Sequence, residues 1–266
     1  MNNYATFCAF YGDPAIKAKH SARLHARQTA DKTVQDAFAE PKGYIAAYCP
    51  SPAKVFDPER DKDYGKYGEW ALLFGYPTPL SGLRDAICEG LPESEARQFA
   101  LDFLAVVPVG ADLRRVWPRF ALWLLSDAAH GVLQFVNAQN GATAQSVVDF
   151  YRVDSAERSG GKDDNLVVAS YSMYAAAGVG ANALRCIFLA AGAACRNLQG
   201  PSFEMGVEFE VEAAACAVKA FVAAAESAGL DSEKARLTQF RAQAEKLIDL
   251  LSSEEETPQE VTSPIA

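Results

Sequence analysis

The segment from Ser94 to Val136 restricts what this chain can fold into more than any other part of it. It reads SEARQFALDFLAVVPVGADLRRVWPRFALWLLSDAAHGVLQFV and holds the densest large apolar side chains of the sequence, with two of its three tryptophans. Burying a large apolar side chain stabilises a fold by about 1.5–3 kcal/mol, so other elements must cover this segment. It therefore predicts the core of a mostly helical protein.

The same segment contains signals that divide it into separate helices. A helix is expected from about Ser94, and residues 108–110 (Pro-Val-Gly) end it because proline cannot continue a helix. Asp112 is expected to cap one turn. Pro118 is expected near the start of the next helix, because a proline in a helix interior costs about 3 kcal/mol.

The chain before this core is expected to begin with one long helix and then to lose its regularity. Asp13 and Pro14 form a strong helix start, and the helix is expected to run to about Phe38. The range 43–79 contains five prolines and many tyrosines, which predicts an irregular surface segment. At its end, a turn at residues 75–77 (Gly-Tyr-Pro) is expected before a helix that ends near Gly90.

The chain after the core is expected to form a turn at Asn140 and Gly141, a short helix, a linker and an alanine-rich region. The polar range 152–165 (RVDSAERSGGKDDN) predicts a linker between an N-terminal helical domain and the alanine-rich region. The expected ranges are 1–151 for the N-terminal domain, 166–252 for the alanine-rich region and 253–266 for a disordered acidic tail. The N-terminal domain is expected to end in a helix at 143–151, and the alanine-rich region is expected to contain helices at 166–198, 203–228 and 231–251.

These elements predict an all-α fold, a multi-helix bundle with an irregular Pro/Tyr-rich surface segment and an Ala-rich C-terminal helical part. An alanine buries about a third of the area that a leucine buries. Alanine-rich helices therefore gain by packing against the larger apolar side chains that precede the linker. For this reason we expect one continuous core.

Composition indicates a cytoplasmic protein that does not bind nucleic acids in general. Lys and Arg number 25 against 34 Asp and Glu, a net charge of −9, whereas nucleic-acid binding favours a basic surface. The N-terminal twelve residues contain no Lys or Arg and no long apolar run, so no secretory signal is expected. The six cysteines are Cys8, Cys49, Cys88, Cys186, Cys195 and Cys216. They lack zinc-ligand spacing, which predicts reduced thiols and no bound metal or cofactor. If the chain is phage-encoded, the compartment is the host cytoplasm.

Three patterns that would indicate other functions lack the context they need. Residues 166–194 are long enough for a membrane span, but Asn182 and Arg185 lie in their middle, so no span is expected. Residues 178–183 match the dinucleotide pattern GxGxxA, but alanines precede them where a strand is needed. The acidic run from Asp57 has lysine where a calcium loop needs glycine.

Two groups of cationic side chains are candidate binding residues. On the N-terminal helix, Arg27 shares a face with apolar residues, and Asp31 follows one turn later. The second group interleaves arginines with indoles, which can stack, hold anions or anchor a protein partner: Arg114, Arg115, Trp117, Arg119 and Trp123. The alternative, that the tryptophans belong to the core and the arginines to a solvated surface beside Asp112 and Asp127, stays open.

The run from Gly68 to Asp127 resembles an uncharacterised family of bacterial and phage-encoded proteins, most specifically in VPVGADL…VWPRFA…LL. The segments RQTAD (27–31) and AEKLIDLL (244–251) are also similar to that family, which has an alanine-rich C-terminal region. Where the family tends to have a Gly/Cys/His-rich segment before the turn at Gly75, this chain has GYIAAYCPSPAKVF without histidine. The family has no known activity, so the resemblance assigns no functional residues.

Two functional hypotheses follow. The first is a non-enzymatic helical protein that binds another protein or forms a homo-oligomer, for example as a counter-defence or immunity accessory of a phage or mobile element. Its support is the absence of catalytic motifs, the acidic composition and the resemblance. The second is an enzyme or small-ligand binder that recognises a phosphate or carboxylate through Arg27, Asp31 and Arg119 and the neighbouring Arg/Trp group.

Overall fold

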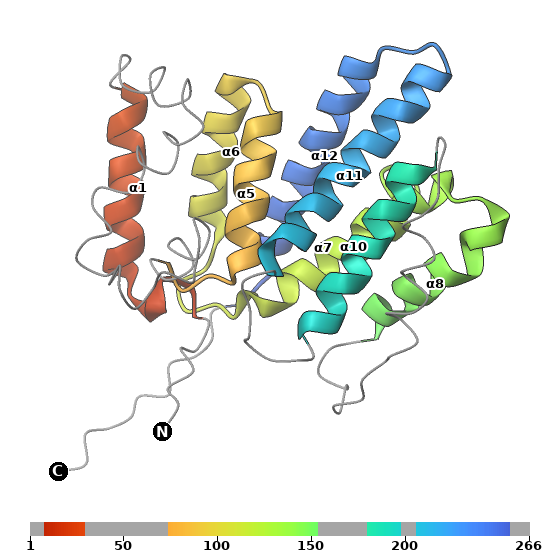
Figure 1. Cartoon of the computed structure of the whole chain (residues 1–266). Helices are drawn as coiled ribbons and strands as arrows, with labels where there is room; N and C mark the ends of the chain where they lie inside the picture. Colours follow the sequence, from red (N-terminus) through yellow and green to blue (C-terminus); the bar gives the residue numbers. More distant parts are fainter. Residues whose placement is uncertain (1–7, 30–73, 154–179, 198–205, 256–266) are drawn as a thin grey trace, which may run out of the picture.

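A computed structural model of the protein describes residues 8–29, 74–153, 180–197 and 206–255. Within these ranges the chain forms eight α-helices, joined by loops and short 3-10 turns, and no strand (Figure 1). The predicted all-α fold class is confirmed. The elements are η1 (Ala9–Gly12), α1 (Pro14–Thr29), α5 (Thr78–Gly90), α6 (Glu93–Val106), η3 (Leu113–Arg115), α7 (Val116–Ser126), η4 (Val132–Phe135), α8 (Ala138–Arg152), α10 (Ala181–Asn197), α11 (Gly206–Ser227) and α12 (Ser232–Ser252).

Three aspartates that the sequence marked as helix starts do cap described elements. Asp13 before α1 accepts a hydrogen bond from the backbone N–H two residues later at 2.8 Å, and Asp112 before η3 does so at 3.0 Å. Asp231 before α12 accepts one from the backbone N–H three residues later at 3.0 Å. Each cap satisfies an N–H that the helix cannot, a contribution of about 1 kcal/mol.

Helix α5 lies at the centre of the bundle. It packs against α6, α11 and α12 and also meets α7. Figure 1 shows it between α6 on one side and α11 with α12 on the other, with α1 and α8 at opposite ends of the molecule. A single cluster of buried apolar side chains extends from Phe10 through α5 to Leu251, and it includes the alanine-rich helices.

Helices α10 and α11 form the most extensive helix pair of the described structure. Buried alanines line both helices, among them Ala190 on α10 and Ala217 on α11, and small side chains allow two helix axes to approach closely. Tyr151 of α8 donates its hydroxyl hydrogen to the Ala190 carbonyl at 2.7 Å, which attaches α8 to this pair. None of the described helices combines the length and the apolar character that crossing a membrane requires.

Two parts of the described chain differ from the sequence-based prediction. Asn140 and Gly141, predicted to form a turn, lie inside α8 because Asn137 caps that helix and accepts a hydrogen bond from the Asn140 N–H at 3.1 Å. The end of the segment predicted to lie on the surface enters the core instead. Phe74 and Tyr76 are buried there, because their rings pack on each other and on other aromatic rings.

Several predicted features lie outside the described residues. They are the N-terminal helix beyond Thr29, residues 43–73, the linker at 154–165, residues 166–179 and the tail from residue 256.

Candidate functional site

The candidate site suggested by the sequence is the basic edge of α7, which comprises Arg114, Arg115 and Arg119. The break after α6 and the cap at Asp112 start η3, which continues directly into α7. A spacing of four residues places Arg115 and Arg119 one turn apart on the same side of the helix. The side chains of Arg114 and Arg119 are 65% and 47% exposed, and Arg115 is exposed as well.

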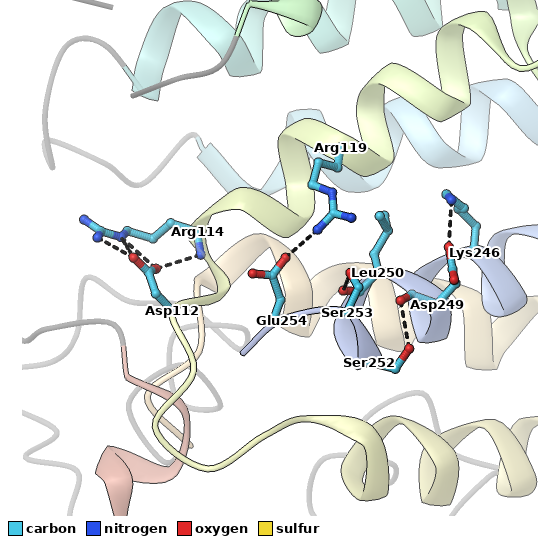
Figure 2. A network of polar contacts seen from close by, with 9 residues as sticks. All are labelled: Asp112, Arg114, Arg119, Lys246, Asp249, Leu250, Ser252, Ser253 and Glu254. Carbon is cyan, nitrogen blue, oxygen red and sulfur yellow. Dashed lines mark hydrogen bonds and ion pairs between the residues drawn. The ribbon is translucent and has the colours of Figure 1, made fainter. Parts of the chain in front are cut away.

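Asp112 fixes the first arginine of this edge. The Arg114 Nε donates to both carboxylate oxygens of Asp112, at 2.8 and 2.9 Å (Figure 2). These hydrogen bonds lower the pKa of Asp112, although partial burial acts in the opposite direction. The same bonds raise the pKa of Arg114. Both groups are therefore charged at neutral pH, and Arg114 is already partnered.

The third arginine contacts a carboxylate from the far end of the chain. Arg119 Nη1 lies 2.7 Å from Glu254 Oε1, and the two residues are 135 positions apart. Figure 2 shows Glu254 just past the end of α12, directed at Arg119. Ser253 holds the chain there, because its hydroxyl donates to the Leu250 carbonyl at 2.7 Å and its N–H bonds to the last turn of α12. The side chain of Glu254 is only 14% exposed.

The arginines lie where helix electrostatics do not favour cations. The N-terminus of a helix carries a partial positive charge, which stabilises acidic groups and opposes basic ones. The first turn of α7 contains no acidic residue and Arg115 precedes it, while the Asp112 carboxylate caps the η3 turn that leads into α7. The basic edge therefore adds side-chain cations to a positive helix end, a combination that attracts anions.

The tryptophan of the predicted group lies underneath this edge. Trp117 is buried, with 3% of its surface exposed, and packs beside Phe120. Its Nε1–H has no hydrogen-bond partner among the described residues. Trp123 is half-buried and lies against His130. In the described structure the indoles therefore support α7 from the core side, while the arginines face solvent, as in the alternative interpretation of this group.

The predicted part of the N-terminal helix in this site, Arg27 with Asp31, stays a prediction. Lys17 in the second turn of α1 donates to the carbonyl oxygens of Ala105 and Val107, both at 2.7 Å, which fixes that end of α1 at the end of α6. Arg27 follows ten residues later, about 15 Å further along the helix axis. The side chain of Arg27 and the whole of Asp31 lie outside the described residues.

Sequence reasoning did not identify Glu254 as part of this site. Glu254 belongs to the range 253–266 that was predicted to be a disordered acidic tail, and an ion pair across 135 positions leaves no local pattern in the sequence. The only usable signal is the run of three glutamates at 254–256 directly after a well-marked helix.

Metal ligands are not grouped in the described part of the chain, where no three His, Cys, Asp or Glu side chains lie close enough together to bind an ion. The cysteines with described side chains are free thiols: Cys8, Cys88, Cys186 and Cys216. No protein-family model, curated protein or solved structure matches this chain. The resemblance to an uncharacterised phage-encoded family therefore stays a prediction from the sequence.

Proposed function

We propose that this protein acts without catalysis, by binding an acidic segment of another protein at the basic edge of α7. The observation that supports this most directly is the Arg119–Glu254 contact at 2.7 Å, in which a carboxylate already occupies the edge. The chain's own C-terminal segment supplies it. An acidic partner segment would take the place of Glu254 and extend along α7 toward Arg115.

Charge also favours this surface over the rest of the molecule. At the basic edge, Arg114 pairs with Asp112 and Arg119 with Glu254, and Arg115 lies between these two pairs along the chain, so cationic side chains gather on this part of α7. The whole chain has a net charge of −9 and repels an acidic partner elsewhere. Complementary charge of this kind selects partner and orientation more than it adds affinity, because an exposed pair contributes about 0.2–1 kcal/mol.

The cellular setting in this proposal comes from the sequence resemblance. A phage or mobile-element accessory that captures a host or competing protein, in counter-defence or immunity, needs a binding surface and no catalytic centre. A second copy of this chain, which would offer its own acidic C-terminal segment, is the other possible occupant of the edge.

A labelled acidic peptide tests the proposal. The probe is a fluorescent peptide with the sequence of residues 253–260, SEEETPQE, titrated with the full chain and followed by fluorescence anisotropy. Binding should weaken as ionic strength rises from about 0.01 to 0.15 M, because the Debye length shrinks from about 30 to about 8 Å. Glu254→Gln should strengthen binding about 1.4- to 5-fold, since it frees Arg119 from a pair worth about 0.2–1 kcal/mol.

The controls separate this edge from general charge attraction. The double variant Arg115→Ala/Arg119→Ala should lose the peptide, whereas Arg241→Ala, which removes an equally exposed arginine paired with Glu95, should not. Equal binding by the double variant, or no binding at low salt, would contradict the proposal. Displacement of the peptide by inorganic phosphate at constant ionic strength would instead support the small-anion hypothesis. A concentration-dependent dimer that Glu254→Gln abolishes would identify a second copy as the partner.

A further inference from the structure

The first part of α8 and the loop before it form a surface that carries no formal charge at neutral pH. The range 128–148 is the longest in the chain without Asp, Glu, Lys or Arg, although these residues make up 22% of the sequence. Many of its side chains are exposed, and we name this set the neutral face: Ala128, Ala129, Gln134, Asn137, Ala138, Gln139, Ala142 and Ser146. The basic edge lies toward the other end of α7, so the two surfaces are distinct.

The outer side of α8 differs from that of an ordinary surface helix. Helix α8 packs on α7 and α10, and its buried residues include Ala144, Val147 and Val148. Its first charged residue is Asp149, which lies in the last turn. The exposed residues of α12, in contrast, include Glu233, Lys234, Arg241, Glu245 and Asp249. Solvent-facing sides of helices usually carry such charges, whereas the cores of protein interfaces are depleted of them. The outer side of α8 therefore has the composition of a surface that a protein covers.

Gly141 in the middle of α8 is not explained by packing within one chain. A glycine inside a helix costs about 1 kcal/mol relative to alanine. A Cβ at Gly141 would meet no atom of the described chain within 4 Å, so a larger residue would fit there. At Gly192 of α10 the situation is the opposite, because a Cβ would lie 3.0 Å from the Phe209 ring of α11. A glycine allows another backbone to come close, and at Gly141 only a second molecule can do so among the described contacts.

Partly exposed aromatic rings lie beside the neutral face. Phe135 of η4 and Phe221 of α11 meet edge to face with centroids 4.8 Å apart, and the His130 ring lies 6.5 Å from Phe221. All three side chains are half-buried. The residues of α11 between Lys219 and Glu226 are uncharged as well. The uncharged surface therefore continues from the loop onto α11 and includes aromatic groups, which are enriched at protein interfaces.

Hydrogen bonds hold the loop of the neutral face in one conformation. Asp127 Oδ1 accepts from the backbone N–H groups of Ala129 and His130, both at 2.9 Å. Gln239 of α12 donates to the His130 carbonyl at 3.0 Å, and its Oε1 lies 3.1 Å from His130 Nδ1. A surface that is already ordered loses less conformational entropy when it binds.

We propose that the neutral face pairs with the same face of a second copy of this chain, in a symmetric dimer. In a two-fold dimer each surface meets itself, so a surface with charges of one sign would meet its own charge. An uncharged surface avoids this. Amide side chains also suit such pairing, because each has donors and an acceptor, and the neutral face contributes Gln134, Asn137 and Gln139. Two copies with a net charge of −9 each repel one another, so approach costs least where charge is absent.

Sedimentation velocity of the full chain tests the dimer. Between about 1 and 100 µM protein, the mass should rise toward twice that of the 28.6 kDa chain. Raising the ionic strength from about 0.01 to 0.15 M should preserve or strengthen the dimer, because shortening the Debye length from about 30 to about 8 Å screens the repulsion between the copies. A dimer joined through Arg119 and Glu254 should weaken instead. The inference does not depend on the function proposed for the basic edge.

Charged substitutions on α8 locate the interface. Gln139→Glu with Ala142→Glu should weaken the dimer more than about tenfold, since like charges then face each other across the two-fold axis. Gln139→Lys with Ala142→Lys should do the same. An equimolar mixture of the two double variants should dimerise again, because opposite charges then meet. Both positions are exposed, so the urea midpoint of each variant should stay close to that of the natural chain.

Matched variants separate this face from the rest of the surface. Ala18→Glu with Ala22→Glu adds the same charges at exposed positions of α1, at the opposite end of the molecule, and should leave the dimer intact. Glu254→Gln should also leave it intact, so the two proposals fail or succeed independently. The inference is overturned if the chain is a monomer at every concentration, if rising salt dissociates the dimer, if the α1 variant weakens it equally, or if the mixed α8 variants remain monomers. Loss of the dimer in Glu254→Gln would assign it to the basic edge and would also overturn the inference.

Discussion

The hydroxyl of Tyr76 is buried and has no hydrogen-bond partner among the described residues, so removing it should stabilise the protein. A buried hydroxyl without a partner costs about 1–3 kcal/mol. Tyr76→Phe removes that cost and keeps the ring contacts with Phe10, Phe74 and Phe103. Some dispersion contacts of the oxygen atom are lost, which reduces the gain. We therefore expect the free energy of unfolding to rise by about 1 kcal/mol, with a melting temperature about 2–4 °C higher.

Tyr151→Phe is the matched comparison, because the same atom is removed from a hydroxyl that has a partner. Tyr151 donates to the Ala190 carbonyl at 2.7 Å, and losing that bond should lower the free energy of unfolding by about 1 kcal/mol. Urea unfolding followed by far-UV circular dichroism gives both values on the same scale. The reasoning is refuted if Tyr76→Phe destabilises the protein as much as Tyr151→Phe does, since Tyr76 would then have a partner in the folded chain.

Further outcomes follow from other contacts. The Gly75→Ala variant should unfold at a lower urea concentration than the Gly229→Ala variant. Both glycines have a positive φ, which costs about 1–2 kcal/mol for an alanine. Of the two, only Gly75 would place the new Cβ against backbone, 2.3 Å from the Cys8 carbonyl oxygen. Equal midpoints would contradict the close contact. Acid should also destabilise the fold. Hydrogen bonds from arginines lower the pKa of Asp112 and Glu95, so their stabilisation is present above about pH 4 and is lost as pH falls through the lowered values. A urea midpoint that stays constant or rises below about pH 4 would contradict this.

Local features of the fold could be predicted from the sequence because their causes lie within a few residues. Asp13, Asp112 and Asp231 cap helices through N–H groups two or three positions away, and the Pro-Val-Gly break acts on its own backbone. The start of α8 was not predicted, although its cause is also local. Asn137 caps the helix through the N–H of Asn140, but Asn140 and Gly141 together are typical of a turn and were interpreted as one.

The candidate site and the core contacts could not be predicted in the same way, because they join distant residues. Arg119 meets Glu254 only once α7 and the end of α12 lie side by side. The buried position of Tyr76 depends on Phe10 and Phe103, and the sequence around Tyr76, rich in proline and glycine, indicates a surface loop. Apolar patterning predicts that α7 has a buried face, but it does not predict that polar side chains are buried on α5.

Phe10 and Tyr11 form a left-handed turn, with φ values of 55° and 53°, and this turn has a consequence for the order in which the protein folds. The left-handed conformation costs about 1–2 kcal/mol for each of these aromatic residues, and local hydrogen bonds of the turn, from the Tyr11 N–H to the Cys8 carbonyl at 2.8 Å and from the Asp13 N–H to the Phe10 carbonyl at 2.9 Å, offset part of this cost. Tertiary contacts offset the rest, through the burial of Phe10 and the backbone hydrogen bonds that Ala9 makes with Gly110 and Ala111. We therefore expect the turn to become stable only after those partners are in place, late on the folding pathway. Interactions that form late affect the unfolding rate rather than the folding rate, so the lifetime of the native state depends on these few N-terminal residues.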